Sequence, residues 1–269
     1  RSIVDTPSGP SDVRRSLAEI TYFDSQVGTI VGLLAKHGLS DNTLVMVVSE
    51  QGNAFPFAKG ACYDRWLQSA MLVRWPGRVK AGAVSDAMGE YVDVTPTFID
   101  AAGGKPVAGL DGKSFLPVLS GEAKRHKDYV FGIMTTRGIN NGTEAFAIRS
   151  VRDKRYKLIL NLNHESKFTN ACTKSPLFQS MVAKAETGDV LAKRLVHAYH
   201  HRPALELFDM EADPLEMNNL AGQADTKKVL ARLRQKLAAW MRAQGDKGVA
   251  TEMKALERQR PGKSRKKNR

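Results

Sequence analysis

The sequence predicts an α/β domain followed by a smaller antiparallel α+β subdomain. Strand and helix patterns alternate as far as Gly121, which is typical of a layered α/β fold. Beyond Gly121, short strand-like segments follow one another with only turns between them, which favours an antiparallel sheet. We therefore expect residues 1–121 to belong to the α/β domain, residues 122–245 to form the subdomain, and residues 246–269 to form a basic, disordered tail.

The first expected helix covers residues 11–38. Its apolar residues recur at intervals of three and four, Ser11 or Asp12 can cap its start, and Gly38 ends it. A short, continuously apolar and β-branched run follows at residues 43–48. Because strands of a parallel sheet are covered on both faces, this run predicts a central parallel strand.

Two further elements complete the α/β part. Residues 70–75 form an apolar run that ends at Pro76 and Gly77, which predicts a strand followed by a turn. Residues 91–102 predict the end of a strand that passes into a helix, because Pro96 is tolerated in a first helical turn.

The expected subdomain begins with three strands and ends with an amphipathic helix. Turn residues bound each short apolar segment, and the helical segments show apolar residues at intervals of three and four. The expected strands are residues 129–135, 145–151, 156–162 and the edge strand 204–208, and the expected helices are residues 176–199 and 226–241.

The chain is strongly basic, with 41 Lys and Arg against 28 Asp and Glu among 269 residues and a formal net charge of +13. Cations crowd into the tail, where they could hold nucleic acid or an acidic polysaccharide. The tail lacks interleaved aromatic residues, so we expect no specific nucleic-acid binding. No apolar run reaches membrane-spanning length, so we expect no transmembrane helix.

The two cysteines, Cys62 and Cys172, lie far apart in the sequence. They match no zinc or redox spacing, so buried free thiols are favoured over a single disulfide, which stays open as the second reading.

Polar residues of interest follow the expected strand at residues 43–48. Glu50 offers a carboxylate and Gln51 a neutral amide oxygen, and calcium prefers several oxygen ligands of these kinds. Ordinary loops also place polar residues at strand ends, so the spacing alone leaves a metal pair and a plain loop as alternatives. Read alone, Lys59 on the next loop is a solvated cation.

A wider pattern resembles the type I, formylglycine-dependent sulfatase family. In that family a strand ends in an acidic residue followed by an amide residue or a His, and a Gly comes next. On the following loop, a Lys or Arg precedes a Tyr and an acidic residue. The Phe55-Pro56 pair is most similar to the sulfamidase-like branch. The matching segments are Glu50-Gln51-Gly52, Lys59 with Tyr63-Asp64, residues 74–77, 92–97, 111–121 and 207–209, Asp213-Pro214 and Asn218-Asn219-Leu220.

The resemblance implies that this chain is the C-terminal portion of such a protein, including part of an alkaline-phosphatase-like sheet. It implies that Glu50 and Gln51 are calcium ligands and that Lys59 contacts the sulfate or its leaving oxygen. Both ligand positions depart from the commoner Asp-Asn pair by one methylene group, which keeps the charge and the amide.

The family's nucleophile is a formylglycine made in a Cys-x-Pro-x-Arg setting, and no such motif occurs in this chain. Residues 8–11 come near to a serine version, but Asp12 stands where the Arg belongs. We therefore expect no catalytic residue in this chain, formylglycine in a segment upstream of it, and no turnover by the chain alone.

Two other side chains are weaker candidates for substrate binding. Arg137 lies in a turn-rich loop and could grip sugar hydroxyls or a second sulfate, or could simply be solvated in a hairpin connection. His164 could donate to an anion near neutral pH, or could be a lone surface histidine.

The resemblance implies a sulfuric ester hydrolase that uses calcium on a sulfated carbohydrate or another sulfate ester. It also implies export to the periplasm or secretion. The alternative is a non-catalytic fragment that binds sulfated polyanions. A two-zinc phosphatase is disfavoured because no His lies near Glu50. The sequence does not predict an oligomeric state.

Overall fold

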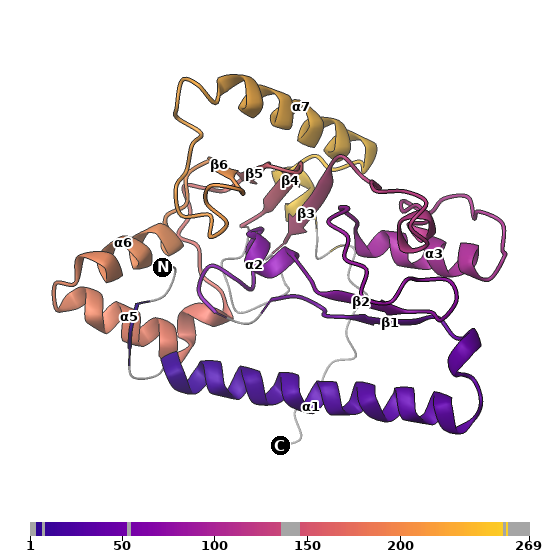
Figure 1. Cartoon of the computed structure of the whole chain (residues 1–269). Coiled ribbons are helices and arrows are strands. Elements are labelled where there is room, and N and C mark those ends of the chain that lie inside the picture. Colours follow the sequence, from indigo (N-terminus) through magenta and orange to yellow (C-terminus); the bar gives the residue numbers. More distant parts are fainter. Residues whose placement is uncertain (1–3, 7–8, 53–54, 136–145, 255–256, 258–269) are drawn as a thin grey trace, which may run out of the picture.

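A computed structural model describes residues 4–6, 9–52, 55–135, 146–254 and 257, and it has the expected α/β fold (Figure 1). A long helix lies along one side, a two-stranded sheet lies next to it, and a four-stranded sheet is covered by further helices. Short helical turns join these parts; they are η1 (Ser40–Asn42), α2 (Asp64–Leu67), α4 (Leu116–Leu119) and η3 (Ala171–Lys174).

The first helix, α1, runs from Gly9 to Lys36 and confirms the helix expected over residues 11–38. Gly38 ends it in a left-handed conformation with φ 68°. None of its residues is buried, and Leu17 and Ile20 are 57% and 58% exposed. An amphipathic helix normally buries its apolar stripe, so the part of the stripe around Leu17 and Ile20 lacks cover among the residues that the structure describes.

Strand β1 (Val45–Val48) pairs with β2 (Met71–Arg74) in an antiparallel two-stranded sheet, from Val45 opposite Arg74 to Val48 opposite Met71. The prediction of a central parallel strand is wrong within the described residues, where β1 is only half-buried and has β2 as its sole partner. A continuously apolar run indicates that both faces of a strand need cover, but it does not fix the direction of the neighbouring strand.

The segment at residues 91–102 begins with a helical turn and not with the end of a strand. The turn η2 (Tyr91–Asp93) leads directly into α3 (Val94–Ala101). The Asp93 carboxylate accepts a hydrogen bond from the backbone N–H of Glu90 at 2.8 Å, which closes the turn at this point.

The four-stranded sheet confirms the expected antiparallel arrangement, in the order β3 (Val130–Met134), β4 (Ile148–Arg152), β5 (Tyr156–Asn161) and the edge strand β6 (Leu205–Asp209). Because successive side chains of a strand point to opposite faces, each strand contributes to two cores. On one face, Leu158 and Leu207 pack with Leu233 and Leu237 of α7 (Lys227–Ala243).

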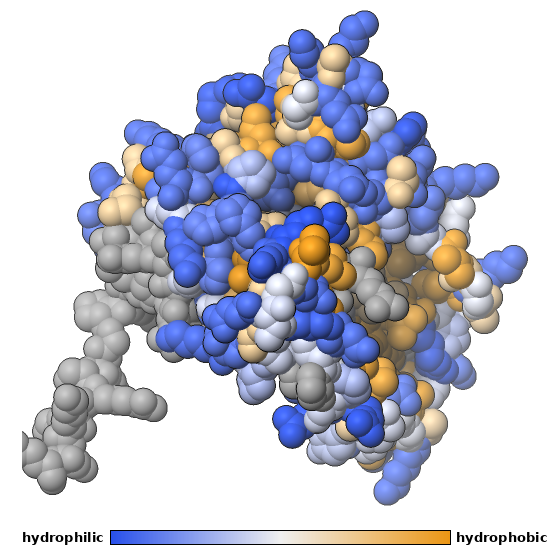
Figure 2. All heavy atoms as spheres, turned by 90° about the vertical axis from the view of Figure 1, so that its left-hand side faces the viewer, coloured by the Kyte–Doolittle hydropathy of each residue, from blue (hydrophilic) through white to orange (hydrophobic). Residues whose placement is uncertain are grey.

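On the other face of the sheet, Ile159 and Phe208 pack with residues of α5 (Pro176–Glu186) and α6 (Val190–His200). The sequence predicted one helical stretch over residues 176–199. It is interrupted at Gly188, which has φ 103°, and Asp189 caps the second helix by accepting from the N–H of Ala192 at 2.8 Å. Seen from the side of α5 and α6, the surface is mostly hydrophilic with scattered apolar patches (Figure 2).

The structure departs from the predicted tail at its beginning. Residues Val249–Met253 form the helix α8, and Glu252 in it is only 2% exposed. Just before α8, Asp246 forms an ion pair with the buried Arg149 of β4 at 2.5 Å. The polar composition after Gly245 suggested a solvated tail, but a charged residue with a buried partner becomes part of the fold.

The core on the α5 and α6 face also contains Phe57, Ala61 and Tyr63 together with Phe146 and Phe178, from both sides of the expected boundary at residue 121. That boundary stays a prediction. In the described part of the chain no helix is long and apolar enough to cross a membrane.

Candidate functional site

Glu50 and Gln51 lie where the chain leaves β1. The Glu50 side chain is exposed, and the Gln51 amide oxygen accepts a hydrogen bond from the indole N–H of Trp66 in α2. The N–H of Gly52 donates to the Trp66 carbonyl at 3.1 Å. A side chain at Gly52 would overlap the Arg65 carbonyl, so this close approach of two backbones requires glycine. The Glu50-Gln51 turn is thus fixed against α2.

The two side chains fit calcium in the type of their oxygen atoms but supply only part of a site. Calcium takes about six to eight oxygen ligands. Among the described residues, no group of three or more His, Cys, Asp or Glu side chains could hold a metal ion. Further ligands would have to come from elsewhere.

Lys59 is exposed, whereas the residues around it are buried. Its carbonyl accepts a hydrogen bond from the Asn170 amide at 3.1 Å, and Gly60 approaches that amide closely with φ 83°. Phe57, two residues earlier, is buried with φ 60°, a left-handed conformation that is costly for an aromatic residue. The loop backbone is therefore held by its surroundings while the Lys59 ammonium group reaches solvent.

Polar contacts of Tyr63 and Asp64 hold the end of this loop. The Tyr63 hydroxyl donates to Glu206 of β6 at 2.6 Å, and the Asp64 N–H donates to Glu216 at 2.6 Å. The Asp64 carboxylate binds Lys157 of β5 at 2.7 Å and also Arg152 of β4. The Tyr-acidic dipeptide after Lys59 thus connects the loop to three elements of the subdomain.

Lys157 is the centre of this cluster and is 1% exposed. Its ammonium group also lies 2.9 Å from a carboxylate oxygen of Glu216. Burial lowers the pKa of Lys157, which the Glu216 carboxylate opposes, and burial raises the pKa of Glu216. Lys157 and Arg152 are direct cross-strand neighbours, so their like charges need the intervening carboxylate of Asp64.

Comparisons with known proteins show which family the chain resembles. The model of a family described as N-sulphoglucosamine sulphohydrolase, C-terminal, matches residues 52–174. The chain is 36% identical over 208 residues to an ulvan-active sulfatase of Formosa agariphila, covering 77% of this chain and 39% of that protein. It is 30% identical over 252 residues to human N-sulphoglucosamine sulphohydrolase, covering 88% of this chain and 49% of that enzyme.

The chain belongs to the sulfatase family. It matches the C-terminal portion, near the sulfamidase-like members, as the motifs predicted. It spans about two fifths to one half of the length of these relatives.

Solved structures of other proteins share the fold. The yidJ protein of Bacteroides fragilis superposes with a TM-score of 0.65 and 22% sequence identity, over 93% of this chain and 47% of that one. A phosphonate monoester hydrolase from Silicibacter pomeroyi reaches a TM-score of 0.56 with 21% identity, over 84% of this chain and 40% of that one. The expected alkaline-phosphatase-like fold is confirmed, and this fold serves more than one kind of hydrolysed bond.

The structure brings some of the predicted site residues of the sulfatase motifs close together. Trp66 ties Gln51 to α2, and α2 begins at Asp64, so the Glu50-Gln51 turn and the Lys59 loop share one anchor. His164 is exposed in the turn after β5, and no described contact joins it to Lys59. Arg137 lies outside the described residues. The assigned roles of all these residues stay predictions.

Neither cysteine of this sulfatase-family chain has the character of a nucleophile. Cys62 and Cys172 are free and buried, which confirms the reading of the sequence. Burial raises the pKa of Cys62 to about 11, with nearby Lys157 only partly opposing it, and burial also raises the pKa of Cys172. Both thiols are therefore protonated near neutral pH.

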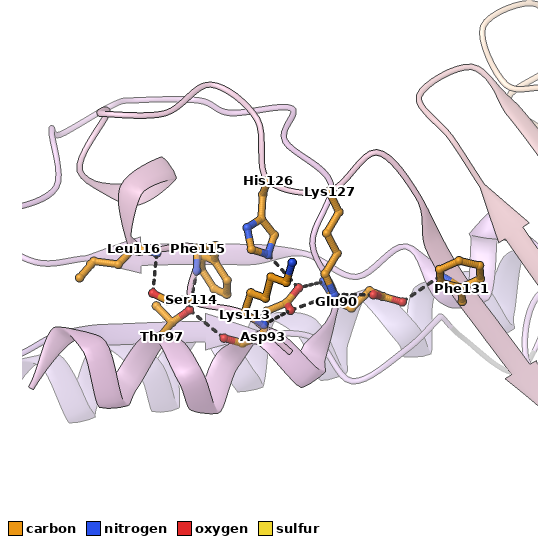
Figure 3. A network of polar contacts seen from close by, with 10 residues as sticks. All are labelled: Glu90, Asp93, Thr97, Lys113, Ser114, Phe115, Leu116, His126, Lys127 and Phe131. Carbon is orange, nitrogen blue, oxygen red and sulfur yellow. Dashed lines mark hydrogen bonds and ion pairs between the residues drawn. The ribbon is translucent and has the colours of Figure 1, made fainter. Parts of the chain in front are cut away.

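Sequence reasoning missed the buried ionic groups. Glu206 and Lys157 occupy inward-facing positions of β6 and β5, and charged residues at such positions of apolar strands are a signal of internal pairing. It also missed Asp93, which lies in a sulfatase-like motif and is fully buried. The Asp93 carboxylate is surrounded by donors (Figure 3), among them Lys127 at 2.8 Å and His126 at 3.1 Å.

Proposed function

We propose that this chain is the C-terminal portion of a calcium-dependent sulfuric ester hydrolase that acts on a sulfated carbohydrate. The observation that carries the proposal is the exposed Lys59, held between the strand-end Glu50-Gln51 pair and the buried Tyr63-Asp64 anchor. The relatives named above act on ulvan or N-sulphoglucosamine by their descriptions, which supports a sulfated sugar as the substrate class.

In this proposal Lys59 offers its three N–H donors to the sulfate or to its leaving oxygen, and a cation there stabilises the charge that develops as the S–O bond breaks. Glu50 and Gln51 would each supply one oxygen ligand to calcium. The bound ion would neutralise sulfate oxygens, and a formylglycine upstream would supply the nucleophile. The anchor at Tyr63 and Asp64 keeps the loop of Lys59 in one position relative to the metal pair.

We further propose that the chain alone is inactive. It contains no Cys-x-Pro-x-Arg motif, and the described acidic side chains offer no complete metal site. The apolar stripe of α1 supports this view, because Leu17 and Ile20 remain more than half exposed in this chain. In the proposed whole protein, that stripe packs against the part of the catalytic domain that lies outside this chain.

The alternative is a non-catalytic protein that binds sulfated polyanions. The net charge of +13 and the absence of the nucleophile motif favour it. Export to the periplasm or secretion belongs to either proposal, since such polysaccharides lie outside cells.

The test begins with the genomic region upstream of Arg1, examined in frame for a signal peptide and a Cys-x-Pro-x-Arg segment. The longer protein and the 269-residue chain are then compared for sulfate release from sulfated saccharides with calcium present. The proposal expects release by the longer protein only. A native start near residue 1, or sulfate release by the 269-residue chain alone, would overturn it.

A further inference from the structure

A second polar site lies away from the Glu50-Gln51 pair. It is a cleft of about 700 Å³, between the segment before η2, the segment before β3, the β4–β5 turn and α7. None of its lining residues is Glu50, Gln51 or Lys59. Its volume is within the range of small-molecule sites, roughly 300–1,000 Å³.

The lining of the cleft is predominantly basic. Six cationic side chains face three carboxylates, those of Asp86, Asp128 and Asp153. Positive charge that stays unpaired in a concave site attracts anions. The six cations are Lys124, Arg125, Lys127, Lys154, Arg155 and Arg232.

Four of the six cations are already held in ion pairs. Arg232 binds Asp153 at 2.6 Å, Arg155 binds Asp209 at 2.7 Å, Lys154 binds Asp86, and Lys127 binds Glu90 and Asp93. Lys124 and Arg125 differ from them. Both are exposed, and neither has an ion pair or side-chain hydrogen bond within the described residues. They are the two cations that an incoming anion would meet without competition.

The network in Figure 3 fixes the segment that carries these two residues. The buried Asp93 carboxylate binds the side chains of His126 and Lys127, which directly follow Arg125. Glu90 accepts from Lys127 at 2.6 Å and from the N–H of Phe131 at 2.8 Å. Because the segment is pinned on one side of Arg125, binding there would cost little ordering of the backbone.

Two tyrosines also line the cleft, and each has a cation near its ring. The guanidinium of Arg155 lies 5.0 Å from the Tyr156 ring, and Lys236 lies 5.1 Å from the Tyr129 ring. The Tyr129 hydroxyl accepts from Arg232 at 2.9 Å. Nucleic acid bases bind mainly by stacking on aromatic faces, and these cations compete for the two rings, so the cleft suits an anion with hydroxyl groups better than a base.

We propose that this cleft binds a sulfate ester group of an oligosaccharide, contacted by Lys124 and Arg125. The guanidinium of Arg125 can pair with two oxygens of one sulfate, and Lys124 adds a second cation beside it. The choice of a sulfated sugar rests on the proposed function, whereas the binding of an oxyanion rests on the cleft itself. The site would hold the chain on a polymer whose reacting group lies elsewhere.

The test uses the full 269-residue chain and calorimetry at one fixed salt concentration. The probes are a heparin-derived hexasaccharide, the same hexasaccharide without its sulfates, and a single-stranded oligonucleotide. The cleft variant is K124Q/R125Q. Its matched control is K193Q/R194Q, which removes the same two charges from exposed positions on α6 that do not line the cleft.

The proposal expects the cleft variant to weaken binding of the sulfated hexasaccharide by about tenfold, or ~1.4 kcal/mol, and the control to change it by less than about twofold. R125K, which keeps the charge but not the paired donors, should lose part of the affinity. The desulfated probe should not bind. Thermal melting of each variant verifies that it is folded.

Equal losses in the two double variants would overturn the proposal and attribute the affinity to net charge. No loss in K124Q/R125Q would also overturn the proposal. Equal binding of the oligonucleotide with the same dependence on Arg125 would overturn the choice of a sulfated sugar. The readout is binding by the chain alone, so failure of sulfate release by the longer protein leaves it unaffected.

Discussion

The ammonium group of Lys157 lies 2.7 Å from the carboxylate of Asp64, 93 residues away in the sequence and inside the protein core. This pair joins β5 of the subdomain to the loop that presents Lys59. The position of the proposed sulfate-contacting residue thus depends on a buried charge in the other part of the chain.

Replacing Lys157 by Met should destabilise the protein strongly. Asp64 and Glu216 would keep buried carboxylates without their cation, and breaking a buried pair in this way costs about 3–5 kcal/mol. Urea unfolding measures the loss. K193M, at an exposed position of α6, is the control and should change the free energy of unfolding by less than about 0.5 kcal/mol. A loss below about 1 kcal/mol in K157M would show that the pair does not anchor the loop.

Replacing Gly52 by Ala should disturb the turn that carries Glu50 and Gln51. The added methyl group would overlap the Arg65 carbonyl, so the two backbones must separate. The expected result is a fall in the free energy of unfolding of about 1–3 kcal/mol. G28A on α1 has open space around the new methyl group and should be neutral or stabilising by up to about 1 kcal/mol. Similar unfolding curves for G52A and wild type would contradict the observed close approach.

The stability of the protein should fall as the pH drops below about 4, in part because of Asp93. Burial alone would raise the pKa of Asp93, but hydrogen bonds from Lys127 and the backbone amides of Lys113 and Glu90 hold it below the ordinary value of 3.8. Such a group adds stability above its unfolded pKa, and this stability is lost as the pH falls through its folded pKa.

Urea unfolding between pH 5 and about pH 2.5 tests this dependence on Asp93. The D93N variant should be less stable than wild type at pH 5 and should lose less stability over the acid range. D24N, an exposed change on α1, should follow the wild-type curve. If D93N shows the same acid slope as wild type, the Asp93 contacts do not contribute in this range.

Both cysteines should resist thiol reagents in the folded protein. Cys62 is fully buried with a pKa raised to about 11 by burial, and Cys172 is nearly as buried. A colorimetric disulfide reagent should therefore label neither thiol at pH 8 within minutes and should label both after unfolding in guanidinium. Rapid labelling of the native protein would mean that this core opens readily.

The sequence predicted the succession of helices and strands and the antiparallel subdomain well, because periodicity and turn residues are local signals. The prediction of a central parallel strand is wrong for β1 within the described residues, since the apolar run Val45–Val48 indicates that both faces need cover but does not fix the direction of the paired strand. The first residues of the predicted disordered tail are also part of the fold. The Arg149–Asp246 pair is a contact between distant residues that composition alone does not reveal.

For the candidate site, the motifs located Glu50, Gln51 and Lys59, but they did not show what holds them. Lys157, Glu206 and Glu216 come from three separate segments and meet only in the folded chain. Charged residues at inward positions of β5 and β6 were the available signal, and their partners could not be assigned without the register between strands.

The most direct test of the proposed site is sulfate release by the longer, calcium-loaded protein with Lys59 intact and with Lys59 replaced by Ala. We predict that K59A lowers kcat by about 100-fold or more, as loss of one donor to a developing negative charge does, while K105A at another exposed position leaves it unchanged. Full activity in K59A would contradict the role of Lys59 and, with it, the site proposed for this chain.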